Sequence, residues 1–333
     1  MLRRLPLALL LLACSPPTDV VLAVGAEHTC LLVPGETPRC FGGDSYGQLA
    51  ATTGFGPSLD IAAGGYTTCA VDLERNIHCA GHNHHGQLGD GTLDASPTPV
   101  RAEGVPPALA VRVGFAHTCA LLEDGGVVCW GWNSIGQAVP GQGLDAAPAR
   151  VEGLPPIVEL VTGYAHTCGF DADRNLYCWG QLTDGQVMRM ADHADAVAIG
   201  VDHLCIATDH VTCLGHMPGG GRPEYPPEGR TFDVDAVLAT GAIDHVCFGT
   251  ADGALCMGKN IYGQLGDGRF DDLVDEPTAV RELPGPLDAL AVGDRHSCAV
   301  HAGAISCWGD NHDGQLGDGT RISSLVPISV PLR

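Results

Sequence analysis

Basic residues, aromatic residues and long apolar runs are all scarce in this 333-residue chain. Lys and Arg together number 17 against 39 Asp and Glu, which gives a formal net charge of −22. Duplex nucleic acid is bound largely by Lys and Arg side chains that neutralise phosphates, so we expect no nucleic-acid partner. Aromatic residues make up 5% of the chain, so the supply of rings for stacking on sugars is thin.

The longest apolar run, at residues 5–12, is too short to cross a bilayer, which takes ~20 apolar residues. It follows two arginines, which is typical of an export signal. The run ends in LLAC at 11–14, which resembles the lipobox of bacterial lipoproteins, where the cysteine is acylated. We therefore predict a lipoprotein signal peptide at 1–13 and an acylated tether at 14–20, with the lipid on Cys14. The alternative is an ordinary secretory signal that contains a cysteine.

The residue after Cys14 bears on location. Under the sorting rule of that lipoprotein class, Ser15 in place of Asp implies retention at the outer membrane of a two-membrane bacterium. We expect a protein that is exported and anchored to the cell envelope by its lipid alone, with no contact between the folded part and the membrane interior.

Seven repeats with a Gly-x-x-His-x-Cys core follow the tether. One copy has Thr67 in the histidine position, and another has an extra residue between Gly241 and Cys247. The first cysteines of successive copies are 37 to 51 residues apart. Repeats of about 40 to 50 residues are typical of four-stranded propeller blades, so the spacing predicts an all-β ring with one blade per repeat.

Each repeat carries a second cysteine 8 to 10 residues after the first, so all of the 15 cysteines except Cys14 fall into local pairs. Exported cysteine-rich domains usually hold disulfides, and we predict one bridge within each blade. The predicted bridges join Cys30 with Cys40, Cys69 with Cys79, Cys119 with Cys129, Cys168 with Cys178, Cys205 with Cys213, Cys247 with Cys256 and Cys298 with Cys307.

The segment between the cysteines of the third repeat supports this pairing. Its turn residues at 123–125 are flanked by apolar residues, which predicts a β-hairpin that places Cys119 opposite Cys129. Facing residues of antiparallel strands have Cα atoms ~4.5 to 5.5 Å apart, within the disulfide range of ~4.4 to 6.8 Å. Two alternatives stay open: reduced cysteines packed as small apolar residues, and zinc held by pairs such as His117 with Cys119.

The segment after the second cysteine carries a longer motif. It reads CWGWNSIGQ at 129–137 and CWGDNHDGQLGDGT at 307–320. These motifs resemble the repeat of the regulator of chromosome condensation family, and the resemblance extends over residues 21–333. It implies a seven-bladed β-propeller. The fifth repeat departs from the pattern, because it has LG at 214–215 and runs through GGG at 219–221 without Gly-Gln, so its outer edge is not defined by the resemblance.

Several repeats end in Pro-x-x-Val, at 97–100, 148–151 and 277–280. We interpret this segment as a strand that leads into the next repeat. The chain starts at Val20 without such a strand and ends with a spare one at 327–330. We therefore predict that the C-terminal strand joins the first blade and closes the ring, which removes the exposed edges of an open sheet.

The recurring histidines do not predict catalysis. Catalysis needs different groups that converge on one point, whereas these histidines repeat at one position around a ring, where hydrogen bonding within the blade explains them. We expect a structural role, no enzymatic activity and no cofactor. The histidines are His28, His117, His166, His203, His245 and His296.

Metal sites are also weakly supported. We interpret the Gly-Asp-Gly segments at 89–91, 266–268 and 317–319 as turns, because calcium takes six to eight oxygen ligands and one Asp supplies too few. A histidine cluster at 78–85 could capture a transition metal, but a polar loop explains it equally well. We predict no metal site.

The loop before Gly-Gln combines one fixed position with variable neighbours. Asn or Asp recurs at 44, 83, 133, 260 and 311, while the residues beside it differ from repeat to repeat. Variable positions in a fixed loop are free to contact a partner, and Trp and Tyr are favoured anchors. The candidate contact residues are Tyr46, His85, Trp132 and Tyr262; the alternative is solvated loops without a partner.

These observations predict a monomeric, envelope-anchored binding or scaffold module for a protein or peptide. A carbohydrate or cell-wall binding module is the alternative. Guanine-nucleotide exchange, the activity of the family's nuclear member, is less favoured, because export separates the protein from cytosolic GTPases and the acidic balance does not suit chromatin.

Overall fold

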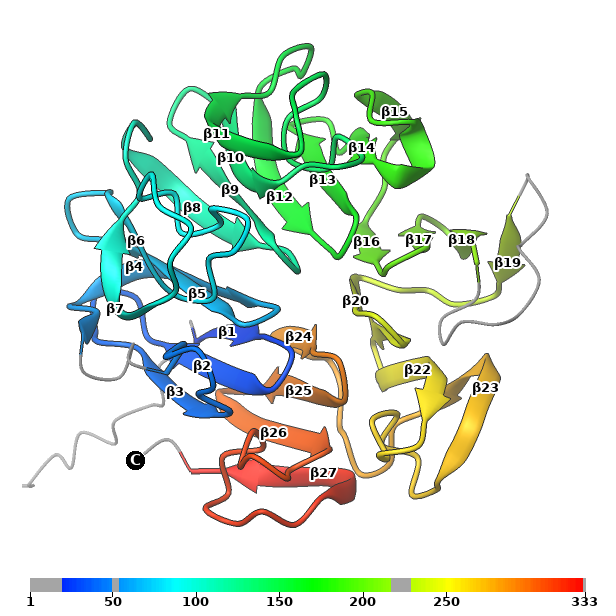
Figure 1. Cartoon of the computed structure of the whole chain (residues 1–333). Coiled ribbons are helices and arrows are strands. Elements are labelled where there is room, and N and C mark those ends of the chain that lie inside the picture. The colour runs from blue at the N-terminus through cyan, green and yellow to red at the C-terminus, as the bar shows by residue number, and fades with distance from the viewer. Residues whose placement is uncertain (1–19, 50–53, 217–228, 332–333) are drawn as a thin grey trace, which may run out of the picture.

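The computed structural model describes residues 20–49, 54–216 and 229–331 and arranges them as seven sheets around an axis (Figure 1). Within each sheet, strands that follow one another in the chain pair antiparallel. The predicted all-β, seven-bladed propeller is confirmed. Cys14, the predicted signal peptide and the tether up to residue 19 lie outside the described residues. No helix in the described part of the chain is long and apolar enough to cross a membrane.

Blades are numbered here from the N-terminus, and the first strand of each blade lies nearest the axis (Figure 1). Blades 1 to 4 contain β1 (Val21–Val24), β2 (His28–Leu32), β3 (Arg39–Gly42); β4 (Ser58–Gly64), β5 (Thr67–Asp72), β6 (Ile77–Gly81), β7 (Ser96–Arg101); β8 (Ala108–Val113), β9 (His117–Leu122), β10 (Val127–Trp132), β11 (Asp145–Arg150); and β12 (Ile157–Thr162), β13 (His166–Asp171), β14 (Leu176–Gly180), β15 (Met188–Ala191), with the 3₁₀ turn η1 (Gln181–Thr183). Blades 5 to 7 contain β16 (Ala196–Ile199), β17 (His203–Ala207), β18 (Val211–Gly215), β19 (Arg230–Phe232); β20 (Leu238–Gly241), β21 (His245–Thr250), β22 (Gly253–Asn260), β23 (Asp271–Ala279); and β24 (Ala289–Val292), β25 (His296–His301), β26 (Ala304–Gly309), β27 (Ser324–Val330).

The central hairpin of each blade carries the predicted disulfide. In blade 3, Gly125 adopts a positive φ of 76° and its N–H donates to the Leu122 carbonyl, which closes the turn. This turn sets the register in which Cys119 faces Cys129. All seven pairs are bonded, with Cα atoms 3.9 to 4.1 Å apart, somewhat closer than we expected for facing residues. This geometry agrees with the predicted disulfides and not with reduced cysteines or zinc pairs.

The core lies between blades rather than within them. One cluster joins Val71 and Ile77 of blade 2 to Val111 and Trp130 of blade 3. The Trp130 side chain is fully buried, and its Nε1–H donates to the Gln87 carbonyl of blade 2 over 2.9 Å. Each blade therefore depends on its neighbour for the burial of its apolar faces, which favours a closed ring.

The prediction that the C-terminal strand joins the first blade is wrong. Strand β27 pairs with β26 and forms the outer edge of blade 7. The Pro-x-x-Val segments belong to the outer strand of their own blade, as β7, β11 and β23 show, and do not lead into the next one. The ring closes instead through side chains, since a cluster with Val20 and Leu31 of blade 1 also contains Val300 and Val330 of blade 7.

Four of the recurring histidines form hydrogen bonds between adjacent blades. The Nε2 atom of each lies 2.8 to 2.9 Å from a Thr or Ser hydroxyl of the next blade. We call these pairs the latches. They are His28 with Thr68, His117 with Thr167, His245 with Ser297, and His296 with Thr29, which spans the closure between blades 7 and 1.

The network around a latch fixes its tautomer. In the latch at blade 1, the Thr29 hydroxyl donates to the Gln315 carbonyl over 2.9 Å, so it must accept the proton from Nε2 of His296. The imidazole is neutral, with Nδ1 unprotonated and unpaired in its buried site. Burial lowers the pKa of His296 to about 3, with a smaller contribution from the nearby His245.

Blade 5 lacks a latch on both sides. Its strand β17 has Leu204 in the hydroxyl position, and the corresponding residue of blade 6 is Val246. The Nε2 atom of His203 is buried without a partner as a result. The outer strand of this irregular blade is β19, which pairs with β18, and the glycines at 219–221 lie outside the described residues.

Candidate functional site

In the four-stranded blades whose loops the structure describes, two loops emerge on the same face of the ring. Antiparallel order places the connection from the first to the second strand beside the connection from the third to the fourth. We call this the loop face. The opposite face carries the short turns from the second to the third strand, such as residues 123–126 of blade 3. All four predicted contact residues lie on the loop face.

The Asn that recurs in the loop from the third to the fourth strand holds this loop together through hydrogen bonds. Asn133 is buried, and its Oδ1 accepts from the N–H groups of Ala138 and Val139, each over 2.9 Å. Its Nδ2 donates to the carbonyls of Val139 and Gly143. The residues at 83, 260 and 311 are also Asn, and the Oδ1 of each accepts from the N–H group five residues later.

The Gln of Gly-Gln holds the variable residues in place. Its Oε1 accepts from the N–H group two residues earlier, over 2.9 to 3.1 Å, in five blades. The residues held in this way are Tyr46, His85, Ile135, Tyr262 and Asp313. The invariant polar groups therefore fix the backbone, and the side chains at these positions are left to face outward.

The Gly-Asp-Gly segments have a structural use. The carboxylate oxygen of Asp267 accepts from Nδ2 of Asn260 over 2.9 Å and from the N–H of Arg269. Asp90 and Asp318 make the same contact with their own Asn. No group of three or more potential metal ligands occurs in the described ranges.

Three of the four predicted contact residues lie within two runs of ring contacts across blades 1 to 4. Tyr46 contacts Tyr66 and His82, with ring centroids 5.4 and 4.7 Å away. The ring of His85 lies 5.8 Å from Trp132, and its Nδ1 pairs with Asp145 over 2.9 Å.

Two aromatic residues that the sequence analysis did not select continue the second run. Trp132 packs edge-on against Tyr164 at 5.8 Å, and Tyr164 stacks on Phe115 at 4.2 Å. We call Tyr46, Tyr66, His82, His85, Trp132, Tyr164 and Phe115 the aromatic row. Tyr262 lies outside this row, where it carries the Arg295 guanidinium 5.0 Å above its ring.

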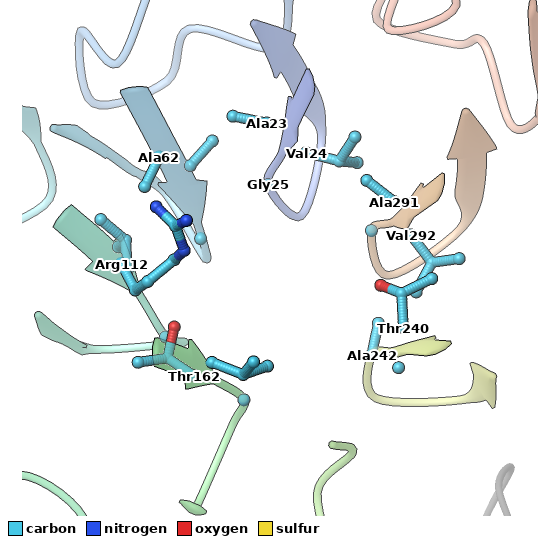
Figure 2. A pocket seen from close by; sticks show the side chains of 18 of the residues that line it. Ala23, Val24, Gly25, Ala62, Arg112, Thr162, Thr240, Ala242, Ala291 and Val292 are labelled. Atoms are coloured by element: carbon cyan, nitrogen blue, oxygen red, sulfur yellow. The ribbon is translucent and has the colours of Figure 1, made fainter. Parts of the chain in front are cut away.

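A cavity of about 320 Å³ follows the ring axis (Figure 2). The first strands of six blades line it with small side chains, among them Ala23, Ala62 and Ala291. Phe115 and Tyr164 lie at the end of the cavity that opens on the loop face, so the aromatic row reaches the axis. Asp294 lies at the same level in blade 7.

Acidic groups surround this opening, which we call the axial mouth. Burial raises the pKa of Asp294 to about 7, and the Asp244 and Glu27 carboxylates add to the shift while Arg295 opposes it. Burial and the carboxylates of Asp313 and Asp310 raise the pKa of Glu27. The potential at the axial mouth is therefore negative, as expected where several carboxylates share a partly enclosed site.

Asp294, Phe115, Tyr164 and Tyr66 occupy the two variable positions of Gly-x-x-His. The glycine itself is constrained, because a side chain at Gly114 would collide with the imidazole of His117. The loop before Gly-Gln was selected because its residues vary between fixed positions. The Gly-x-x-His loop shows the same pattern, so this criterion would also have selected the residues of the axial mouth.

Comparison with known proteins identifies the repeats. Residues 59–87, 109–137 and 157–186 match one model of the Regulator of chromosome condensation (RCC1) repeat, and residues 252–300 match a second. Four segments of the chain therefore match RCC1 repeats, in agreement with the motifs. A structure of Prp20p from Saccharomyces cerevisiae has a TM-score of 0.72 at 18% identity, covering 94% of this chain and 88% of that chain. This likeness shows the shared fold.

The curated relatives are longer proteins. The Ultraviolet-B receptor UVR8 of Arabidopsis thaliana is 29% identical over 140 residues, which is 38% of this chain and 32% of the receptor. The E3 ubiquitin-protein ligase HERC2 of Homo sapiens is 28% identical over 304 residues, 79% of this chain and 6% of the ligase. The Regulator of chromosome condensation of Drosophila melanogaster is 23% identical over 328 residues, 85% of this chain and 60% of the fly protein. This chain spans less than two thirds of each.

Proposed function

We propose that this propeller of RCC1 repeats is a non-enzymatic binding scaffold that engages a protein or peptide partner through the loop face. The observation that carries the proposal is the aromatic row, which gathers side chains from four blades on one face of a rigid ring. Partly exposed Tyr and Trp side chains on fixed loops are the groups from which binding hot spots are built.

The histidines support a scaffold rather than a catalyst. Burial lowers the pKa values of five of the recurring histidines to about 3, with that of His166 lowered to about 4. A group with such a pKa holds too few protons at neutral pH to act as a general acid, and its burial in the core denies access to a substrate. Four of them form hydrogen bonds between adjacent blades.

The proposed location rests on two features of the chain. Seven disulfides in one domain favour an oxidising compartment. The sequence at 11–14 supports acylation of Cys14, and Ser15 supports the outer membrane. In this proposal the lipid is the sole membrane contact and the propeller acts as a monomer close to the envelope. Mass spectrometry of the N-terminal peptide should find a diacylglycerol on Cys14, and Cys14→Ser should move the protein to the soluble fraction.

The binding face is tested by capture from envelope extracts with the whole chain. Trp132→Ala removes the centre of the aromatic row, and Leu73→Ala is the matched control, because Leu73 is an exposed apolar residue in a turn of the opposite face. We expect a partner that is retained by the wild type and by Leu73→Ala and lost by Trp132→Ala. Equal retention by all three would contradict the proposed face.

The same capture separates the classes of partner. A protein partner disappears when the extract is treated with protease beforehand, whereas a bound glycan survives and would favour the carbohydrate alternative. A retained GTPase whose nucleotide release is accelerated by the propeller would favour exchange activity. The absence of any material specific to the loop face would contradict a binding function.

A further inference from the structure

The axial mouth combines a cavity lined largely by small side chains with a carboxylate that has no direct partner. Asp294 is partly exposed at the opening, and within the described part of the chain neither a hydrogen bond nor an ion pair reaches its carboxyl group. The nearest cation is Arg295, which extends over the ring of Tyr262. The charge of Asp294 is therefore left without a direct counter-ion.

The groups that face Asp294 come from four neighbouring loops. Glu27 of blade 1 and Asp244 of blade 6 are acidic, and Asp244 already pairs with Lys259 over 2.8 Å. Tyr164 of blade 4 lines the same cavity as Asp294, and Asp294 helps to raise the pKa of both Tyr164 and Tyr66 of blade 2. A cation that enters the mouth would therefore meet carboxylates and aromatic side chains, the groups that bind guanidinium and ammonium ions.

Arg112 limits how deeply a cation can enter. It lies in the cavity wall two residues before Gly114 (Figure 2). Its Nη1 donates to Asp60 and to the Val111 carbonyl, and its Nε donates to the Leu160 carbonyl. The residue equivalent to Asp294 in this blade is Phe115, three residues after Arg112, so at ~3.3 Å per strand residue the two backbone positions are about 10 Å apart along the axis. A basic side chain would therefore keep its charge at the mouth, above the fixed guanidinium.

We infer that the axial mouth binds the guanidinium or ammonium group of a basic side chain on the partner, with Asp294 as its counter-ion. This inference rests on the proposed function and names the chemistry of the partner: a segment with Arg or Lys that projects onto the axis while its neighbours lie on the aromatic row. The chain's own charge of −22 favours approach of such a basic segment.

The test uses the whole chain with N-butylguanidinium as the probe and uncharged N-butylurea of the same size as its control, at constant ionic strength. The carboxyl ¹³C resonance of Asp294 reports binding. The cation binds the ionised carboxylate, whose fraction rises from about a tenth at pH 6 to about nine tenths at pH 8 around a pKa of about 7. We expect the probe to bind about tenfold more tightly at pH 8 than at pH 6, and N-butylurea to show no such change.

Two charge-matched variants complete the design. Asp294→Asn should abolish the pH-dependent gain, measured through the resonances of Tyr164, whereas Asp252→Asn, in an exposed turn of the opposite face, should preserve it. Equal binding of the charged and uncharged probes, or unchanged binding by Asp294→Asn, would overturn the inference. Loss of probe binding with intact partner capture contradicts the cation site alone, whereas probe binding without any captured partner contradicts the proposed function alone.

Discussion

The buried histidines make the stability of the ring depend on pH. Burial lowers the pKa values of His28, His117, His203, His245 and His296 to about 3, against about 6.5 in an unfolded chain. Between those two values the unfolded state binds more protons than the folded state. The free energy of unfolding is therefore fully retained above pH 6.5 and falls as the pH drops below it.

The size of the effect follows from linkage. Each such histidine costs about 1.4 kcal/mol per pH unit, so acidification from pH 7 to pH 5 costs about 2 kcal/mol per histidine and about 10 kcal/mol for five. Asp294 acts in the opposite direction, because its pKa is raised to about 7, and it offsets roughly 2 kcal/mol. The remaining loss is comparable to the whole stability of an ordinary domain, about 5 to 15 kcal/mol.

Urea unfolding of the oxidised protein at pH 8, 7, 6 and 5 measures this dependence. His117→Gln should reduce the slope by about 1.4 kcal/mol per pH unit, because one proton-linked group is removed. Leu73→Ala, which removes an exposed apolar side chain and no titratable group, is the control and should leave the slope unchanged. An unfolding free energy that is flat from pH 7 to pH 5, or equal slopes for the wild type and His117→Gln, would refute the reasoning.

Three further predictions concern the fixed loop positions, the missing latch and the disulfides. Asn133→Ala removes the acceptor for two buried N–H groups and should cost about 1 to 3 kcal/mol in urea unfolding, whereas Ser134→Ala, at an exposed neighbour, should change stability by less than about 0.5 kcal/mol; equal losses would contradict the division into fixed and variable positions. Val246→Thr offers a hydroxyl to the unpaired imidazole of blade 5 and should raise stability by about 1 kcal/mol relative to Val246→Ala, a gain that a melting temperature no higher than that of the alanine variant would disprove. Replacing both Cys119 and Cys129 with Ala should lower the unfolding free energy by about 2 to 3 kcal/mol, and an unchanged value would show that the bridge does not restrain the unfolded chain.

The sequence predicts the parts of the fold that repeat locally. The register that places Cys119 opposite Cys129 depends on a turn of a few residues, so the spacing alone determines it. The way the ring closes is different, because the spacing between repeats is the same whichever strand of a blade comes first in the chain. Only the pairing of β27 with β26 shows that each blade is a continuous stretch of chain, and this pairing leaves no pattern in one sequence.

The candidate site was predicted in part for a similar reason. Comparison between repeats selects Tyr46, His85 and Trp132, because they vary inside one fixed loop, and the structure places Tyr46 in one run of ring contacts and His85 and Trp132 in the other. Their approach to Tyr164 and to the axis depends on how blades pack against each other. The latches also join residues in separate blades. A motif such as His-Thr-Cys does not indicate that its histidine bonds to the next blade while its threonine bonds to the preceding one.

The uneven distribution of latches gives the ring a weakest seam. Blade 5 has no His to hydroxyl bond to either neighbour and is joined to them by apolar contacts, by the bond from Gln181 to Asp202 and by the ion pair of Arg230 with Glu276, whereas the junction between the chain ends has a His to hydroxyl bond. We therefore expect local opening of the ring to begin beside β17, in the middle of the chain, while blades 1 and 7 stay packed against each other. Amide protons of β16 and β20 should exchange with solvent before those of β1 and β24, because the ring would open beside blade 5 and not at the junction of blades 7 and 1.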